Sequence, residues 1–262
     1  MSALADINFH YSLIGFVIGA LVGCTGIGGG SLMTPLLVLL FGIAPTTAVG
    51  TDLLYAAITK SGGTLVHARH DTIDWRITRL LATGSVPTAL ATIFALGQLG
   101  KAAPAANAMI TTILGFTLLL TAAALITRTL FLKQPERAGC QYAESTTRAL
   151  TVLLGAVMGV LVTLTSVGAG AIGVTVLLML FPRLPAVRIV GADIAHAVPL
   201  TLIAGLGHWY LGSVDWSLLG SLLIGSLPGI AIGSTFAARA PERLLSLVLA
   251  ATLMLVGTRL VM

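Results

Sequence analysis

The sequence predicts an all-α integral membrane protein built as an inverted-topology repeat, in which each half has a glycine-broken helical hairpin and three transmembrane helices. Three observations predict this fold. Of 262 residues, 56% are hydrophobic and only 9% are charged, whereas a soluble domain carries about 25% charged residues. Long apolar stretches recur from Tyr11 to Met262. The two halves share a residue pattern, and their positive charges lie at opposite ends of equivalent segments.

The internal repeat consists of segment pairs that align at one spacing, apart from a single inserted residue. The pairs are GFVIGALVGCTGIGGG with GAVMGVLVTLTSVGAG (15–30 with 155–170), VGTD with VGAD (49–52 with 190–193), and GSVP with GSLP (84–87 with 225–228). A constant spacing over dozens of residues indicates an internal duplication. The long polar stretch between the copies divides the chain into a first repeat at 1–128, a linker at 129–148 and a second repeat at 149–262.

Each half contains one long glycine-broken segment and three ordinary spans. The expected segments are 11–42, 46–67, 76–97 and 104–128 in the first half, and 149–182, 186–208, 215–237 and 241–261 in the second. The broken segments have more residues than the ~20 that one span needs, yet too few for two spans. Each therefore predicts a helical hairpin that turns at its glycines and only partly crosses the bilayer.

The arginines and lysines predict opposite orientations for the halves. Loop 67–79 carries three arginines, whereas its counterpart near 208–216 has no Lys or Arg; loop 42–46 has none, whereas its counterpart holds Arg183 and Arg188. By the positive-inside rule, this alternation places linker 129–148 in the cytoplasm and both termini outside. We expect a multi-pass protein of the cell membrane without a removable signal peptide.

Several function classes lack their sequence signals. The net charge of +5 comes from residues at span ends rather than from one basic patch, which argues against nucleic-acid binding. Neither a Walker-type phosphate loop nor an HExxH motif occurs, and the two cysteines stand far apart in unlike surroundings. We expect no cofactor, no metal site and no enzymatic activity.

The broken helices predict an anion site. Hairpins that enter from opposite faces bring their tips, Cys24–Ser31 and Thr165–Ala171, towards the membrane midplane. Half-helix N-termini there offer free N–H groups, and glycines let an anion approach the backbone. The expected substrate-binding residues are Thr25, Gly26, Gly28, Gly29, Gly30, Ser31, Thr51, Thr165, Ser166, Gly168 and Gly170. The alternative is that such glycines serve close helix packing, which Gly15, Gly19 and Gly23 fit better.

Four ionisable residues inside the spans are candidates for coupling or gating. Asp52 and Asp193 lie at the same depth from opposite faces; each either exchanges a proton or accepts hydrogen bonds that shape a hairpin. Lys60 either attracts the anion or extends to the membrane surface. His196, one turn after Asp193, is a candidate for ligand contact or proton exchange.

Two further pairs of equivalent residues open the third span of each half. Trp75 and Trp216 are typical interface anchors, and Asp74 and Asp215 directly before them predict helix N-caps.

The opening glycine motif, APTTAVGTD (44–52), HAR (67–69) and IDW (73–75) together resemble the TauE/SafE family of membrane permeases, also described as sulfite exporters. The resemblance covers nearly the whole chain. It implies a permease for sulfite, sulfonates or related organosulfur anions, usually moved outward. One departure is that acidic Asp52 and Asp193 stand where the family pattern has a small polar residue.

The residues and the resemblance together predict a secondary transporter that exports a small anion across the lipid bilayer, with protons as a candidate coupling ion. A homo-oligomer is compatible with the sequence. Two alternatives stay open: a passive anion channel using the same cradle, and an intramembrane aspartyl-type enzyme using the two aspartates.

Overall fold

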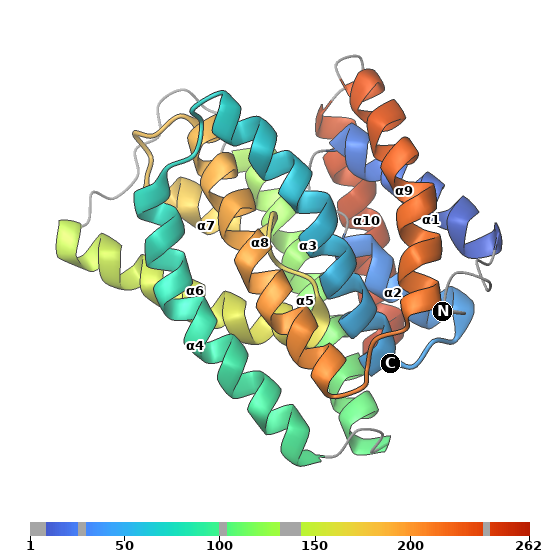
Figure 1. The fold of residues 1–262 in the computed structure, drawn as a ribbon. Helices are drawn as coiled ribbons and strands as arrows, with labels where there is room; N and C mark the ends of the chain where they lie inside the picture. Colours follow the sequence, from blue (N-terminus) through green and yellow to red (C-terminus); the bar gives the residue numbers. More distant parts are fainter. Residues whose placement is uncertain (1–8, 26–29, 100–103, 132–142, 238–241) are drawn as a thin grey trace.

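The computed structural model describes residues 9–25, 30–99, 104–131, 143–237 and 242–262. Within these ranges the chain forms helices joined by short connections, with no strand (Figure 1). The helices are α1 (Phe9–Thr25), α2 (Gly30–Phe41), α3 (Pro45–Arg69), α4 (Trp75–Leu99), α5 (Pro104–Phe131), α6 (Glu144–Thr165), α7 (Ile172–Leu180), α8 (Ala186–Tyr210), α9 (Trp216–Ala237) and α10 (Glu242–Val261).

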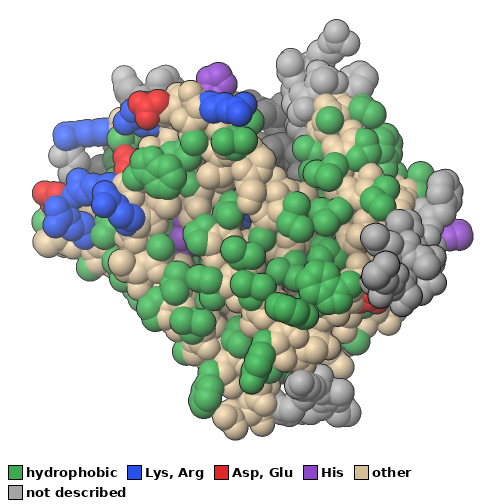
Figure 2. All heavy atoms as spheres, in the orientation of Figure 1, with side chains coloured by type: hydrophobic (Ala, Val, Ile, Leu, Met, Phe, Trp, Pro, Cys, Tyr) green, Lys and Arg blue, Asp and Glu red, His purple; other side chains and the backbone are tan. Residues whose placement is uncertain are grey.

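The ordinary spans expected from the sequence all appear as single helices, with ends within a few residues of the expected ones. Among the described residues, five helices are long and apolar enough to cross a membrane: α4, α5, α6, α8 and α9. The space-filling view shows hydrophobic side chains spread over the visible face, while Lys and Arg gather at one end (Figure 2). Large apolar side chains such as Phe94, 69% exposed, face outward, as expected for a surface solvated by lipid.

The second glycine-broken segment, predicted as a hairpin that partly or barely crosses the bilayer, has two arms of unequal length. Its first helix, α6, has 22 residues, about 33 Å of helix and enough for a complete span. Its second helix, α7, has nine residues and reaches only about 14 Å. The hairpin thus combines a full-length helix with a short return helix. Helices α5 and α6 also extend from both sides into the stretch 129–148 that the sequence indicates as a linker.

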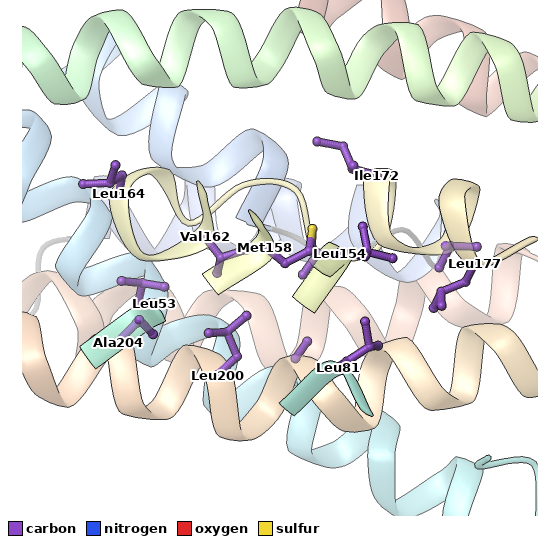
Figure 3. Close-up of a cluster of buried hydrophobic side chains, with 14 of the residues drawn as sticks. Leu53, Leu81, Leu154, Met158, Val162, Leu164, Ile172, Leu177, Leu200 and Ala204 are labelled. Atoms are coloured by element: carbon purple, nitrogen blue, oxygen red, sulfur yellow. The ribbon is translucent and has the colours of Figure 1, made fainter. Parts of the chain in front are cut away.

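Helix pairing joins the two halves of the chain. Helix α1 packs along α9, α4 along α6, α3 along α8 and α5 along α10. A buried apolar core lies among α3, α4, α6, α7 and α8, and Figure 3 shows part of it around Met158, Leu81 and Leu200.

Equivalent glycines make equivalent close contacts in these pairs. A Cβ on Gly15 would lie 2.6 Å from the carbonyl oxygen of Leu222, and one on Gly155 would lie 2.2 Å from that of Leu81. Gly19 likewise meets the backbone of α9, at 2.5 Å from the Ser226 oxygen. The expected packing role of Gly15 and Gly19 is therefore confirmed, because only glycine lets the helix backbones approach this closely.

Replacing Gly84 by alanine is expected to destabilise the fold. The new Cβ would lie 2.0 Å from the Val152 carbonyl oxygen and 2.7 Å from the Ala156 nitrogen, both backbone atoms that cannot turn away. Forcing α4 and α6 apart should cost about 1–3 kcal/mol, measured as a lower unfolding temperature of the purified chain in detergent. Gly220→Ala is the matched control, because a Cβ there would have no atom from elsewhere in the described part of the chain within 4 Å. Equal unfolding temperatures for the two variants would contradict this packing.

The two expected N-caps are confirmed. Asp74 Oδ1 accepts hydrogen bonds from the backbone N–H groups of Arg76, at 3.0 Å, and Ile77, at 3.2 Å. Asp215 Oδ1 accepts one from the Leu218 N–H at 2.9 Å. Both caps satisfy N–H groups that a helix start leaves unpaired, and they fix where α4 and α9 begin.

Candidate functional site

The tip of the second hairpin reverses the chain through left-handed backbone. Ser166 follows α6 with φ 57°, and Gly168 and Gly170 have φ 113° and 102°. The segment then runs back along α6, so that a Cβ on Gly168 would contact the side chain of Met158; Figure 3 shows the return at Ile172 beside α6. Glycine adopts such φ values without steric cost, which is why the sequence turns here.

Thr165 and Ser166 have different surroundings at this tip. The Thr165 hydroxyl donates to the Leu161 oxygen at 2.6 Å and accepts from the Val167 N–H at 3.2 Å. It therefore holds the turn in shape. The Ser166 side chain is also buried, but its hydroxyl has no hydrogen bond within the described part of the chain. It lies beside the carboxylate of Asp52, from the other half of the sequence.

Asp52 is completely buried on α3. The Thr34 hydroxyl of α2 donates to its Oδ2 at 2.6 Å, while Oδ1 has no hydrogen bond from any described residue. With Ser166 as a further neighbour, this carboxylate joins α2 and α3 of the first half to the hairpin tip of the second.

Asp193, the repeat equivalent of Asp52, is buried on α8 against the start of α7. A Cβ on Gly173 would lie 2.2 Å from Asp193 Oδ1, so the carboxylate rests on the bare backbone of α7. The backbone amide of Gly170 is among its polar neighbours. Among described residues neither carboxylate oxygen has a partner with hydrogen-bond geometry. Burying a polar group without hydrogen-bond partners costs folding free energy. A protein that keeps such a group usually needs it for function.

Lys60 lies within electrostatic range of the two carboxylates, although no salt bridge joins it to either of them among the described residues. It lies on α3, eight residues after Asp52, is partly buried, and interacts electrostatically with both Asp193 and Asp52. Its repeat equivalent is Thr201, whose hydroxyl donates to the Ala197 oxygen at 2.8 Å. The two halves thus supply one carboxylate each but only one lysine between them.

His196 has a partner that sequence reasoning missed. Its Nε2 lies 2.7 Å from the Ser85 hydroxyl of α4, and its Nδ1 has no partner in the described ranges. In the repeat alignment, Tyr55 is equivalent to His196 and Ser226 is equivalent to Ser85. The equivalent pair is also in contact, because Ser226 is a side-chain neighbour of the Tyr55 hydroxyl. The repeated GSVP and GSLP segments, which hold both serines, were the available signal. Thr34 had none.

The remaining predicted substrate-binding residues either lie away from the two aspartates or are not among the residues that the structure describes. The Thr51 hydroxyl accepts a hydrogen bond from the Asp215 N–H at 3.1 Å, at the turn between α8 and α9. Thr25 ends α1, and Gly30 and Ser31 begin α2, but their side-chain surroundings are not described. Gly26, Gly28 and Gly29 lie outside the described residues.

Several apolar spans around a buried group of charged side chains at a helix break are the features of a membrane transporter. The family model described as Sulfite exporter TauE/SafE matches residues 11–260, so the chain belongs to this family, as its motifs indicated.

Curated relatives agree with this assignment. The "Probable membrane transporter protein YjnA" of Bacillus subtilis (strain 168) is 42% identical over 252 residues, covering 95% of this chain and 98% of the relative. The "Probable membrane transporter protein YdhB" of the same organism is 30% identical over 234 residues, covering 88% of this chain and 90% of the relative. No solved structure matches the chain.

Proposed function

We propose that this membrane transporter is a secondary carrier that exports a small anion, sulfite or an organosulfonate, bound between the tips of its two hairpins. One observation carries the proposal: the second hairpin tip, two buried carboxylates and one lysine come together from both halves of the chain. The family description supports sulfur oxyanions as the substrate class and the outward direction.

The charges of this cluster suit an anion that travels with a proton. With both carboxylates ionised, Asp52, Asp193 and Lys60 carry a net charge of −1, which repels an anion. Protonation of one carboxylate makes the cluster neutral and leaves Lys60 available to the anion. We assign this proton to Asp193, whose oxygens accept no hydrogen bond from the described residues, whereas Asp52 accepts one from Thr34 at 2.6 Å. His196 lies one turn from Asp193 and is the candidate for passing the proton on.

The hairpin tip supplies the neutral part of the site. Ser166 offers a hydroxyl that has no hydrogen bond with correct geometry in the described part of the chain, and the backbone at Gly168 and Gly170 leads into the N-terminus of α7. The positive end of the α7 helix dipole favours an oxyanion at this position. In the first half, Thr25, Gly26, Gly28, Gly29, Gly30 and Ser31 are proposed to play the equivalent part.

We further propose that the halves, 1–128 and 149–262, are inverted in the membrane, with linker 129–148 in the cytoplasm and both termini outside. The pairing of helices between the halves supports this. Helix α1 of the first half packs on α9 of the second, and the equivalent α6 of the second half packs on α4 of the first. Gly15 contacts α9 in the same way as its equivalent Gly155 contacts α4. An inverted repeat needs such a two-fold relation to form one central site from two hairpins.

The substrate class is tested by counterflow in proteoliposomes. Vesicles loaded with unlabelled sulfite should accumulate labelled sulfite transiently, and external methanesulfonate or sulfate should compete if they share the site. Empty vesicles and an unrelated membrane protein are the controls. The absence of exchange for all three anions, in protein shown to be folded and inserted, would contradict the proposed substrate.

Gly173→Ala is expected to reduce this exchange about ten-fold while leaving the fold intact. The added methyl group would overlap Asp193 Oδ1 at 2.2 Å, so the carboxylate must turn away from α7, and a misplaced active group commonly costs this much or more. Gly63→Ala is the control, because among the described residues its Cβ would meet only Ile194 Cγ2, at an ordinary 3.6 Å. Equal exchange by both variants would show that the position of Asp193 is unimportant.

A further inference from the structure

A second charged hollow lies apart from the transport site, where α4 and α6 begin and α7 ends. It measures about 260 Å³ and combines charged and apolar side chains. The lining residues are Arg76, Ile77, Leu80, Glu144, Thr147, Arg148, Leu180, Phe181, Pro182, Arg183 and Leu184. No residue proposed for transport is among them.

The charges of this hollow favour an anion. Glu144 is held by Arg76 and by Arg148, the latter at 2.7 Å. Arg183 also lines the hollow, and within the described ranges it has no acidic partner. Three arginines against one glutamate leave a net charge of +2, and guanidinium groups bind phosphate oxygens in a bidentate manner. Figure 2 shows the blue side chains gathered at this end of the molecule.

The rest of the hollow is mostly apolar, and it lies at the ends of two helices that are long and apolar enough to span a membrane. Ile77, Leu80, Phe181 and Leu184 form much of its wall. Helices α4 and α6 are membrane spans that start here, and Trp75, beside Arg76, is 54% exposed. An exposed tryptophan at a span end marks the membrane interface. A free inorganic anion would use only the arginines, whereas a phospholipid would use both surfaces.

We propose that this hollow binds an anionic phospholipid, with the phosphodiester against Arg148 and Arg183 and an acyl chain along Leu80 and Phe181. Basic pockets between spanning helices are suited to such headgroups. The bound lipid would tie the start of α4 and α6 to the end of α7. This inference is independent of the transported substrate, since it rests on a different set of residues.

Native mass spectrometry of the full chain tests the proposal. The protein, stripped of lipid in mild detergent, is offered equal amounts of phosphatidylglycerol and phosphatidylcholine. Wild type should retain phosphatidylglycerol in preference, and Arg183→Gln should lower that retention about five-fold, the effect of roughly one kcal/mol per arginine near a lipid surface. Arg183→Lys should keep most of it. Arg188→Gln is the control, since Arg188 is exposed nearby but does not line the hollow.

Equal retention of the two lipids by wild type would overturn the proposal. So would an equal loss in Arg183→Gln and Arg188→Gln, which would indicate only general surface charge. Displacement of phosphatidylglycerol by millimolar inorganic phosphate would also overturn it, because the site would then recognise the free anion. A higher unfolding temperature in nanodiscs containing phosphatidylglycerol, lost in Arg183→Gln, would support it.

Discussion

Asp193→Asn is expected to abolish the stimulation of anion transport by a pH gradient, a loss of at least about ten-fold, while anion exchange without a gradient continues. Asparagine keeps the shape of the side chain against Gly173 but cannot bind and release the proton that the proposed cycle needs. Because both oxygens of Asp193 lack hydrogen bonds in the described part of the chain, the substitution breaks no hydrogen bond there and removes only the charge that faces Lys60. The measurement is sulfite uptake into proteoliposomes at several imposed pH differences.

Asp52→Asn is the matched control for this variant. In the wild type the Thr34 hydroxyl donates a hydrogen bond to the Asp52 carboxylate at 2.6 Å. The asparagine amide oxygen can still accept this hydrogen bond, so the contact of α2 with α3 should persist. We expect this variant to keep a gradient response, with altered anion affinity. A wild-type response in Asp193→Asn would assign Asp193 a structural role instead of proton exchange.

Lys60→Met is expected to reduce sulfite transport about 100-fold or more at every pH tested. Lys60 is the cation that interacts with both Asp52 and Asp193. Removing Lys60 leaves the two buried carboxylates without the cation near them, and the anion loses its positive counter-charge in the same step. Methionine retains the length and apolar stem of lysine, so packing along α3 should change little.

Lys60→Arg separates charge from shape in this experiment. It should retain a substantial part of the flux, because the positive charge remains, although the larger guanidinium group fits differently. Unfolding temperatures of all variants must stay close to that of wild type for the comparison to hold. Transport by Lys60→Met at the wild-type rate would mean that Lys60 merely extends to the membrane surface.

The spans could be predicted from sequence because their signals are local. The stretch 186–208 is mostly apolar and is preceded by Pro185, and the structure has α8 at Ala186–Tyr210. Glycine spacing likewise predicts packing, since Gly15 and Gly19 lie on one face of α1. The asymmetry between α6 and α7 could not be predicted in this way, because the position of the turn depends on the left-handed residues Ser166, Gly168 and Gly170.

The charged residues of the candidate site could be predicted from the sequence more easily than the polar residues that contact them. Asp52, Asp193 and Lys60 stand out because ionisable residues are rare in apolar spans. Their partners depend on helix packing between distant segments: Thr34 bonds Asp52, and Ser85 bonds His196 across 111 residues. Thr51, which directly precedes Asp52, was predicted to bind substrate. Successive helical residues point about 100° apart, so its hydroxyl instead accepts a hydrogen bond from the Asp215 N–H.

Uphill accumulation of sulfite tests the central claim most directly. Proteoliposomes with equal sulfite inside and outside receive an imposed pH gradient, with the membrane potential clamped to zero by potassium and valinomycin. A proton-coupled carrier should concentrate sulfite several-fold above the level reached in protein-free vesicles, which accounts for passive distribution of the protonated species. The excess should disappear with a protonophore and in Asp193→Asn. Sulfite that flows only down its own gradient in wild type, with no excess accumulation, would contradict the carrier and indicate a passive anion channel.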